Sequence, residues 1–312
     1  MDENDMKEGE ISRLPSIVQL SVVIASNHST REVDRCLRTL QQQRKVEGME
    51  IIVADSRSDD SLQEVITKYP EVVFIRLPEK TPLPMLWGAG IARSQGEIIA
   101  ITDSTCVADA HWISAILKAH ESSHAVVGGA VEAGGDKNVV GWAAYFCEYG
   151  QFMRPLSEGP AHVLPGNNIS FKRWTLTKGQ EFVQNGFWKT YWCRRLQGEG
   201  IELISTPTMV IYDNKCYRLI PFLIRRFHHG RCFAGMRILR ESSLMRAAYI
   251  LASPLLPLLF LGRTTSAIVS KRRHLKPFIL SLPVSILAIM VWSAGELCGY
   301  LTGIGDSCTY TC

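Results

Sequence analysis

The sequence lacks the patterns that define several large classes of protein. It has no internal repeat and no low-complexity tract, which excludes solenoids, propellers and fibrous proteins. Its net charge of +4 over 312 residues is too small to predict binding to nucleic acid. Because 46% of the residues are hydrophobic and only 21% are charged, the chain can bury a sizeable core, and general disorder is excluded.

Cysteine pairs and a secretion signal are also missing. The nine cysteines form no CxxC motif and show no metal-ligand spacing. A chain of this length does not need disulfides for stability, so we expect the thiols to be reduced and mostly structural. The first twenty residues have no apolar run, so no signal peptide is predicted. We expect residues 1–19 to be a flexible leader on the cytoplasmic side.

Two common phosphate-binding motifs are absent too. The sequence contains neither a GxGxxG after its first predicted strand nor a GxxxxGK[ST]. The first absence argues against a dinucleotide-binding Rossmann domain, and the second argues against a phosphate-loop NTPase. An unrelated α/β protein such as a nucleotidyltransferase is a distant alternative, because it would need a basic, glycine-rich phosphate loop.

The first 130 residues contain short β-branched runs that alternate with helix-length amphipathic stretches. This alternation predicts a parallel α/β sheet, and the continuous apolar runs predict burial of both sheet faces. The predicted strands are 21–25, 50–55, 72–77 and 97–103. Ligands of such sheets lie beyond the carboxyl ends of the strands. The residues to inspect there are Ser26, Asn27, Asp55, Ser58 and Asp103.

Two long stretches without charge follow Met245, at residues 247–262 and 277–295. The second has 19 residues, enough to cross a hydrocarbon core of about 30 Å. Residues 215–246 hold eight Lys/Arg and one acid, and residues 263–276 hold five Lys/Arg and no acid. Both flanks of the first stretch are therefore expected on the cytoplasmic side. We expect the first stretch to be re-entrant or interfacial and only the second to be able to span; two buried core helices are the alternative.

An ordered set of motifs resembles the family 2 glycosyltransferases with the GT-A fold. The motifs are SVVIASNHSTREVDRCLRTL, IIVADSRSDDS, GAGIARSQGEIIAITDSTC, VVGGAVE, LPGNNISFKR, FWKTYWCRRLQGEG and RRFHHGRCFAGMR. The sequence is most similar to membrane-anchored bacterial members, which end in a hydrophobic region and GE-x-x-GYL, here Gly295 to Leu301. The resemblance implies a GT-A domain at 20–240, of the Rossmann-like nucleotide-diphospho-sugar transferase type. A membrane-associated hydrophobic region at 241–303 and a short tail at 304–312 would follow.

The resemblance also assigns the donor site. An acid after the second strand hydrogen-bonds the nucleotide base in this family, and Asp55 stands there. Ser26 and Asn27 follow the first strand, and Ser58 lies in the loop with Asp55. The implied donor is a nucleotide sugar, usually linked to UDP. The alternative for Asp55 is a turn former or helix cap in a loop rich in Asp and Ser.

The implied cofactor is Mg²⁺ or Mn²⁺, which would neutralise the departing diphosphate through carboxylate ligands. Family members carry an Asp-x-Asp or a similar acidic pair at the end of the fourth strand. Here the sequence is Asp103-Ser104-Thr105, so Asp103 alone is the expected metal ligand. As an alternative, Asp103 caps the following helix.

The catalytic base is missing from its usual place. The inverting mechanism of the family needs a carboxylate that takes the proton of the acceptor hydroxyl. Relatives carry an acid where this chain has Lys189, next to Trp188. Lysine is a poor base because it is protonated at neutral pH unless it is strongly buried. The nearest acids, Glu181 and Glu199, do not have the family's spacing.

Two further motifs are complete. The resemblance places acceptor-binding amides in the loop Gly166-Asn167-Asn168, for which an ordinary Asn-rich turn is the alternative. The motif RRFHHGR supplies cationic donors suited to a diphosphate or to anionic lipid headgroups, or else forms a solvated face. The phosphate-binding candidates are Arg226, His228, His229 and Arg231, with Arg225 beside them.

The predicted function is that of a membrane-associated inverting glycosyltransferase at the cytoplasmic membrane. It would transfer a sugar from a nucleotide-diphosphate donor to a lipid-linked or polysaccharide acceptor, with its catalytic domain on the cytoplasmic side. The alternative is a catalytically weakened or inactive relative that binds nucleotide or glycan, because Lys189 replaces the base and only Asp103 remains of the metal motif.

Overall fold

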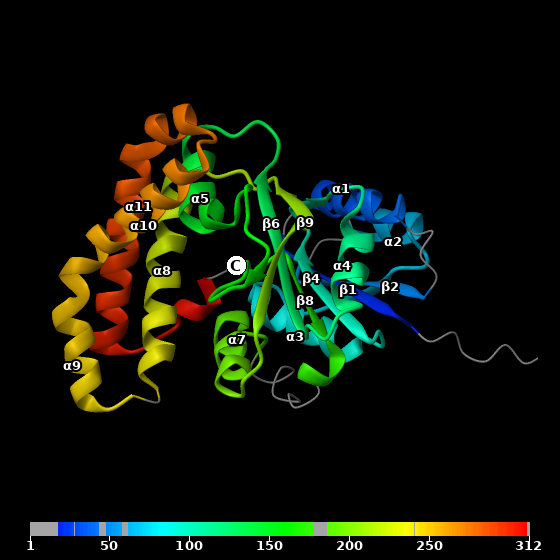
Figure 1. Ribbon diagram of the computed structural model, residues 1–312, viewed down its shortest axis with the longest axis horizontal. Helices are drawn as coiled ribbons and strands as arrows, with labels where there is room; N and C mark the ends of the chain where they lie inside the picture. Colours follow the sequence, from blue (N-terminus) through cyan, green and yellow to red (C-terminus); the bar gives the residue numbers. More distant parts are fainter. Residues whose placement is uncertain are drawn as a thin grey trace, which may run out of the picture.

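The computed structural model describes residues 18–27, 29–43, 48–57, 62–176, 186–239 and 241–310. The predicted leader, apart from its last two residues, lies outside these ranges, as do Ser58 and Glu181. A central sheet carries helices on both faces, and a layer of C-terminal helices stands beside it (Figure 1).

The four predicted strands all form. They are β1 (Leu20–Ser26), β2 (Met49–Asp55), β3 (Val73–Arg76) and β4 (Ile98–Asp103). β1 pairs in parallel with β2 and β4, and β2 pairs in parallel with β3. Every residue of β1 is buried, as expected for a strand covered on both faces. The predicted parallel sheet is therefore confirmed for the four strands between Leu20 and Asp103.

Residues 106–213 extend this sheet with strands of mixed direction that the sequence pattern did not predict. Within the described residues the strand order is β3-β2-β1-β4-β8-β6-β9-β5, and β7 pairs with β9. β8 is antiparallel to both of its neighbours, whereas β6 and β9 are parallel. The added strands are β5 (Cys106–Ala108), β6 (Val126–Ala133), β7 (Gly159–Pro160), β8 (Ile169–Lys172) and β9 (Leu203–Asp213).

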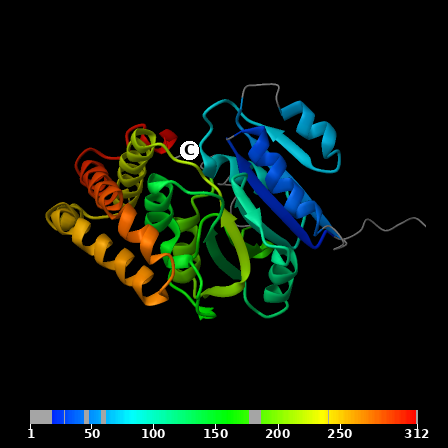
Figure 2. The same cartoon turned by 90° about the horizontal axis from the view of Figure 1, so that it is seen from above.

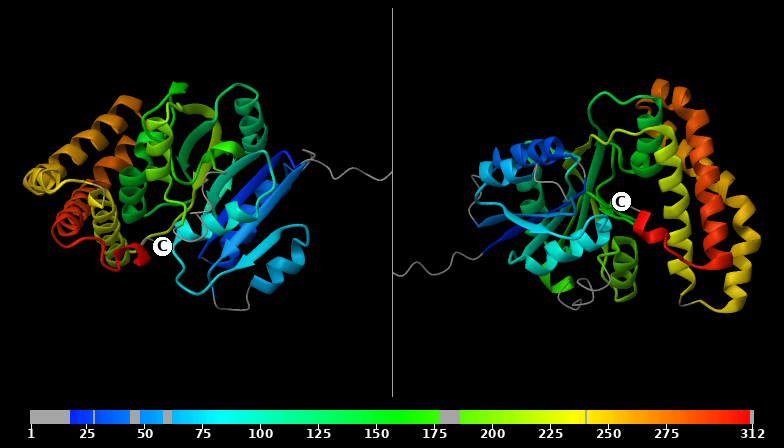
Figure 3. Two further views of the ribbon diagram at one scale, coloured as in Figure 1. Left: turned by 90° about the horizontal axis from the view of Figure 1, so that it is seen from below. Right: turned by 180° about the vertical axis from the view of Figure 1, so that it is seen from behind.

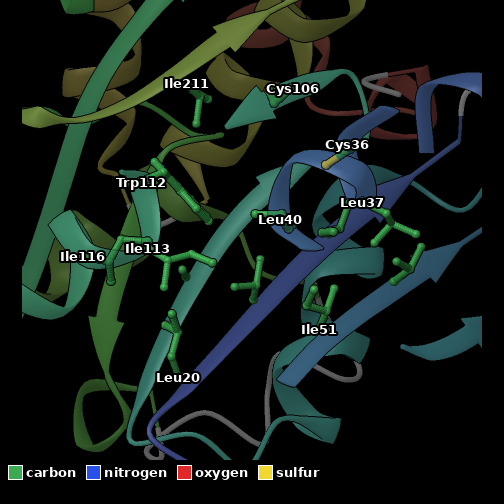
Figure 4. Packing of buried hydrophobic residues seen from close by; sticks show 14 of the residues in the cluster. Leu20, Cys36, Leu37, Leu40, Ile51, Cys106, Trp112, Ile113, Ile116 and Ile211 are labelled. Carbon is green, nitrogen blue, oxygen red and sulfur yellow. The ribbon is translucent and has the colours of Figure 1, made fainter. Parts of the chain in front are cut away.

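Amphipathic helices cover both faces of the sheet (Figure 2). One face carries α1 (Thr30–Gln41), α2 (Leu62–Lys68) and α4 (Trp112–His120). Figure 4 shows Leu37 and Leu40 of α1 beside the sheet, in one cluster with Trp112 and Ile113 of α4. The other face carries α3 (Leu83–Arg93) and α7 (Lys189–Gly198). Because strand side chains alternate, odd residues of β1 such as Val23 face α3, whereas even residues of β1 such as Val22 face α1.

The C-terminal helices form a layer beside this sheet (Figure 3). They are α8 (Leu219–Ile238), α9 (Ser243–Ala252), α10 (Leu256–Lys271) and α11 (Leu275–Thr302), with α5 (Val139–Tyr149) between them and the sheet. α11 contacts α8 and α5, and its buried residues run from Phe278 to Tyr300 along one face. Short 3₁₀ helices occupy Gly150–Phe152, Arg173–Thr175, Ser253–Leu255 and Ser307–Tyr310, the last labelled η4 below.

Glycines set the distance between α8 and α11. A Cβ atom on Gly295 would lie 2.1 Å from the carbonyl oxygen of Phe227, and one on Gly299 would lie 2.5 Å from that of Arg231. From the opposite side, a Cβ atom on Gly230 would lie 2.4 Å from the carbonyl oxygen of Trp292. Only glycine permits this approach, so the GE-x-x-GYL motif is in part a helix-packing motif.

The two apolar segments form helices long enough to cross a membrane, Ser243–Lys271 and Leu275–Thr302. In their most apolar windows, 6% of the first and 39% of the second are buried. The alternative of two buried core helices therefore does not describe the first segment. Its exposed apolar side chains include Leu244, Leu251, Leu255, Leu258 and Leu259.

The expectation of reduced cysteines is wrong for one pair. Cys232 on α8 and Cys308 in η4 form a disulfide, with their Cα atoms 5.1 Å apart. The two residues are separated by 76 positions in the sequence, and only the packing of η4 against α8 brings them together. The other six described cysteines are free thiols, and Cys312 lies outside the described residues.

Candidate active site

A cavity of about 360 Å³ lies where the end of β4 meets α3, α5, α7, α8 and α11. Aromatic side chains form much of its wall, among them Trp87, Tyr149, Phe187, Trp188, Tyr191, Phe233 and Trp292. Charged side chains from distant parts of the chain also line it: Asp103, Glu148, Lys189, Lys215, Arg225 and Arg226. Apolar walls with a few convergent charges are typical of a small-molecule site.

The strand-end residues lie together, as the parallel sheet requires. In the sheet register Ser26 is paired with Asp55, and Ala25 is paired with Asp103. The Ser26 hydroxyl and the Asn27 side-chain oxygen are buried and have no hydrogen-bond partner within the described residues. Unsatisfied buried polar atoms at the carboxyl ends of parallel strands are suited to a polar ligand.

Asp55 is engaged by its own loop. Its carboxylate accepts hydrogen bonds from the backbone N–H and the Nε of Arg57, and the Arg57 Nη2 lies 3.0 Å from Asp55 Oδ2. The hydrogen bond from the Arg57 backbone N–H to Asp55 agrees with the alternative in which Asp55 forms a turn. Asp55 is 1% exposed and is not among the cavity-lining residues.

Asp103 does line the cavity, but its carboxylate is bound within the protein. Oδ1 accepts hydrogen bonds from the backbone N–H and hydroxyl of Thr105 and from the thiol of Cys106. Oδ2 lies 3.2 Å from the Nζ of Lys215, which follows β9. Burial opposes the charge of Lys215, yet the Asp103 carboxylate raises the pKa of this lysine above its ordinary value.

These contacts do not fit the metal role expected of Asp103. The described residues contain no group of three or more His, Cys, Asp or Glu side chains that could hold a metal ion. The next two residues, Ser104 and Thr105, carry neutral hydroxyls, so no second acid follows Asp103 directly. Hard divalent cations prefer several carboxylate oxygens, and here the one carboxylate already binds a lysine.

Lys189 begins α7 at the wall of the cavity, next to Trp188 at the N-cap position. Its Nζ donates a hydrogen bond of 2.5 Å to the carbonyl oxygen of Leu164. A Cβ atom on Gly166 would lie 3.7 Å from the Lys189 Cε, so the predicted acceptor loop and the predicted base position do meet. Burial lowers the pKa of the Lys189 ammonium. Glu199 ends α7 and pairs with Arg195, away from the cavity lining.

The two asparagines of the acceptor motif have different surroundings. Asn167 lines the cavity, and its side-chain oxygen has no hydrogen-bond partner within the described residues. Asn168 is fully buried in the domain, where it accepts a hydrogen bond from Trp112 and donates to the carbonyl oxygens of Ala130 and Met209. These contacts do not fit the expectation that Asn168 binds the acceptor, because its side-chain polar atoms are used by the fold.

The residues of the basic motif on α8 also have different surroundings. Arg226 and His229 line the cavity, where Arg226 has a buried Nε without a hydrogen-bond partner among the described residues. Burial, with the nearby Arg226 charge, lowers the pKa of His229 to about 4. His228 instead stacks on Tyr310, and Arg231 donates to Gly303. The predicted phosphate-binding role of His228 and Arg231 does not fit, since both contact the C-terminal segment and neither lines the cavity.

Three cavity residues escaped sequence analysis. Glu148 on α5 pairs with Arg225 at 2.6 Å and lies 3.4 Å from the hydroxyl of Tyr217. Burial works to raise the pKa of Glu148, but the cations around it, Arg225 first, hold this pKa below the ordinary value. Trp292 comes from the apolar segment and touches the cavity from α11. Lys215 begins the basic flank 215–246, whose charge pattern does not single it out as a site residue.

The domain has the GT-A fold. A solved structure similar to it is the mannosyltransferase PcManGT from Pyrobaculum calidifontis, in complex with GDP-mannose and Mn²⁺. The two superpose with a TM-score of 0.55 at 14% sequence identity, over 91% of each chain. S. aureus TarS gives a TM-score of 0.48 at 13% identity, over 89% of this chain and 90% of TarS.

Sequence comparison gives the family. Residues 21–175 match glycosyl transferase family 2. A segment of 113 residues is 26% identical to the uncharacterized glycosyltransferase YfnE of Bacillus subtilis (strain 168), covering 35% of this chain and 29% of YfnE. Residues 21–175 therefore form a family 2 glycosyltransferase domain, and the aligned segment spans less than a third of the length of YfnE.

Proposed function

We propose that the enzyme transfers a sugar from a nucleoside diphosphate donor to a glycan or lipid-linked acceptor, with inversion at the anomeric carbon. The observation that carries this proposal is the cavity itself. It joins the strand-end residue Asp103 to the acceptor-loop residue Asn167 and to the cations of α8. A donor diphosphate and an acceptor hydroxyl would meet between these groups.

The donor nucleotide is proposed from the strand ends. Ser26 and Asn27 offer buried oxygens without partners within the described residues, and Asp55 offers a carboxylate that can accept from a base N–H. UDP is the nucleotide that the family resemblance implies, whereas the solved structure of PcManGT is a complex with GDP-mannose. Binding assays should therefore include both UDP and GDP.

Glu148 is the carboxylate that we propose as the general base in place of Lys189. Among the described cavity-lining residues the acids are Asp103 and Glu148. Asp103 is bound through both of its oxygens. Glu148 has one oxygen on Arg225, and its other oxygen has only the longer contact with Tyr217. The cations around it keep Glu148 ionised at neutral pH, the state in which it can accept a proton.

Measurement of donor hydrolysis and sugar transfer tests this assignment. We expect Glu148→Gln to lower turnover by roughly 10²- to 10⁴-fold, the usual contribution of general base catalysis, while nucleotide binding is retained. Glu199→Gln is the matched control, because Glu199 lies outside the cavity lining. Unchanged turnover in Glu148→Gln would assign the base elsewhere. If the native chain and Lys189→Glu both bind nucleotide without turnover, the alternative of an inactive relative applies.

We also propose that the chain is held at the cytoplasmic membrane by the helical hairpin formed by α9, α10 and α11, lying in the plane of the membrane. α11 packs lengthwise on α8, which carries Arg225, Arg226 and Arg237. If α11 crossed the bilayer, these charges would lie at hydrocarbon depth, where each is costly. An in-plane hairpin keeps them in the domain and places the exposed leucines of α9 and α10 in the interface.

Cell fractionation tests the hairpin. Leu251, Leu258 and Ile279 are 79%, 70% and 67% exposed. We expect replacement of all three by Glu to move the full-length chain from the membrane to the soluble fraction. Trp174→Glu, at an exposed site of the α/β domain, is the control and should not change fractionation. Recovery of the unmodified chain in the soluble fraction without detergent would contradict the proposal. The basic residues around the hairpin support the cytoplasmic side.

A further inference from the structure

At the end of β4, the Lys215 side chain lies beside Asp103, where the family resemblance predicts a divalent cation. Lys215 Nζ lies 3.2 Å from Asp103 Oδ2, and both side chains are buried, at 6% and 3% exposure. The other oxygen of Asp103 accepts from Thr105 and Cys106. A metal ion could use this carboxylate only by displacing the lysine.

The next carboxylate is also neutralised by lysine. Asp213, which pairs with Cys106 in the sheet register, lies 2.9 Å from Lys137 Nζ, and both of these side chains are almost fully buried. A divalent cation entering this region would meet two fixed ammonium groups whose charges already balance the two carboxylates. Repulsion between like charges in a buried site disfavours its entry.

The cavity nevertheless has the charge that a diphosphate needs. Its two acids each have a cationic partner, Asp103 with Lys215 and Glu148 with Arg225. Arg226 and Lys189 have no carboxylate partner within the described residues, and the Arg226 Nε is buried without any hydrogen-bond partner. Lys215 and Arg226 both line the cavity, so both can contact an anion bound there.

We propose that this enzyme binds the diphosphate of its donor without a divalent cation, using the Lys215 ammonium, positioned by Asp103, as a built-in counter-ion and Arg226 as the second cation. The proposal rests on the proposed use of a nucleoside diphosphate donor. It assigns Lys215, which sits 112 residues after Asp103, to the part that Mg²⁺ or Mn²⁺ would otherwise play. Such cationic side chains are direct ligands for phosphate oxygens.

Titration calorimetry on the full-length, detergent-solubilised protein tests the proposal with UDP, GDP and inorganic pyrophosphate as probes. We expect the unmodified chain to bind at least one nucleotide equally, within about twofold, in EDTA and in Mn²⁺. Lys215→Met should weaken this binding at least tenfold in EDTA, and Lys215→Arg should keep most of it. Because Lys215→Met frees the Asp103 carboxylate, added Mn²⁺ should partly restore binding in this variant alone.

Lys137→Met is the matched control, since it removes the neighbouring buried lysine, which is not among the cavity-lining residues. The role of Lys215 would be overturned if Lys137→Met lost as much nucleotide affinity as Lys215→Met. It would also be overturned if Lys215→Met unfolded and Lys215→Arg bound nucleotide weakly. Metal independence would be overturned if the unmodified chain bound nucleotide only in the presence of Mn²⁺. It would also be overturned if the unmodified chain, together with nucleotide, quenched the paramagnetic resonance signal of Mn²⁺. Either result would leave the proposed function standing. No binding of UDP or GDP under any condition would reject the proposed function itself.

Discussion

The guanidinium carbon of Arg226 on α8 lies 4.1 Å from the ring centroid of Trp292 on α11. This cation–π contact joins the catalytic domain to the apolar segment at the wall of the cavity. The indole Nε1 of Trp292 in turn donates to the buried carboxylate of Glu296. The helix that we assign to the membrane hairpin therefore contributes directly to the position of a cavity cation.

Removal of the indole should weaken nucleotide binding. A buried cation–π contact contributes about 1 to 2 kcal/mol, so we expect Trp292→Leu to raise the Kd for UDP or GDP roughly 5- to 30-fold. Trp292→Phe keeps an aromatic face and should lose less. The measurement is titration calorimetry at fixed salt. Equal affinities for all three proteins would show that Trp292 supports the helix layer and not Arg226.

Asp55 offers a second test at the strand ends. We expect Asp55→Ala to weaken nucleotide binding by roughly 1.5 to 3 kcal/mol, because a charge-assisted acceptor for the base is lost. Inorganic pyrophosphate, which has no base, should bind the variant as it binds the unmodified chain. If both probes lose affinity alike, Asp55 acts by holding the loop through Arg57. An unchanged Kd for UDP and GDP would remove Asp55 from the donor site.

Lys189 tests whether the chain is a weakened enzyme. We expect turnover by the native chain to be low, and Lys189→Glu to raise it or leave it unchanged, because a carboxylate at the family position can act as base. Lys189→Met removes the cation without adding a carboxylate, so its comparison with Lys189→Glu separates the two effects. Sugar transfer and donor hydrolysis are the measurements. Robust native turnover that Lys189→Glu abolishes would give the lysine a positive catalytic role.

The contact between α8 and α11 leaves no space for a side chain at Gly299. Its Cβ atom would also lie 2.8 Å from the Cβ of Ala234, so we expect Gly299→Val to destabilise the fold by about 1 to 3 kcal/mol. Gly262→Val on α10 is the matched control, since nothing lies within 4 Å of its Cβ position. Thermal unfolding in detergent compares the two. Equal midpoints would contradict the close helix contact.

His120 predicts the sensitivity of the fold to acid. Burial lowers its pKa from 6.5 to about 4, against a weaker opposing hydrogen bond with the His124 carbonyl oxygen. The unfolded chain therefore takes up this proton first, and stability falls as the pH drops from about 6.5 towards 4. We expect the free energy of unfolding to fall between pH 7.5 and pH 4.5, and to fall less in His120→Asn than in the unmodified chain, by a few kcal/mol at most. Denaturant unfolding at the two pH values is the measurement. A loss of the same size in both proteins would contradict the prediction.

The first four strands could be predicted because their signal is local. Each is a continuous apolar run that ends at a polar residue, and parallel pairing then aligns Ser26 with Asp55 and Ala25 with Asp103. The later strands mix parallel and antiparallel neighbours, and β8 is inserted between β4 and β6 from a distant part of the chain. No local pattern specifies such an order.

The site was predicted by motif, and motifs do not resolve neighbouring side chains. Asn167 and Asn168 are adjacent, but they lead into a strand, where successive side chains point in opposite directions. His228 and His229 are adjacent on a helix, and only His229 is turned towards the cavity. The pairing of Lys215 with Asp103 joins the residue that ends β4 to a residue that follows β9, so it depends on the tertiary structure.

The disulfide between Cys232 and Cys308 closes the chain into a covalent ring that contains α9, α10 and α11. Any single peptide bond cut inside this ring leaves both fragments attached to one molecule, and only reduction separates them. Limited proteolysis of the hairpin would therefore yield one band on a non-reducing gel and two on a reducing gel. A genetic truncation after α8 is a different operation, because it also removes the partner of Cys232 and uncovers the glycine face of α8.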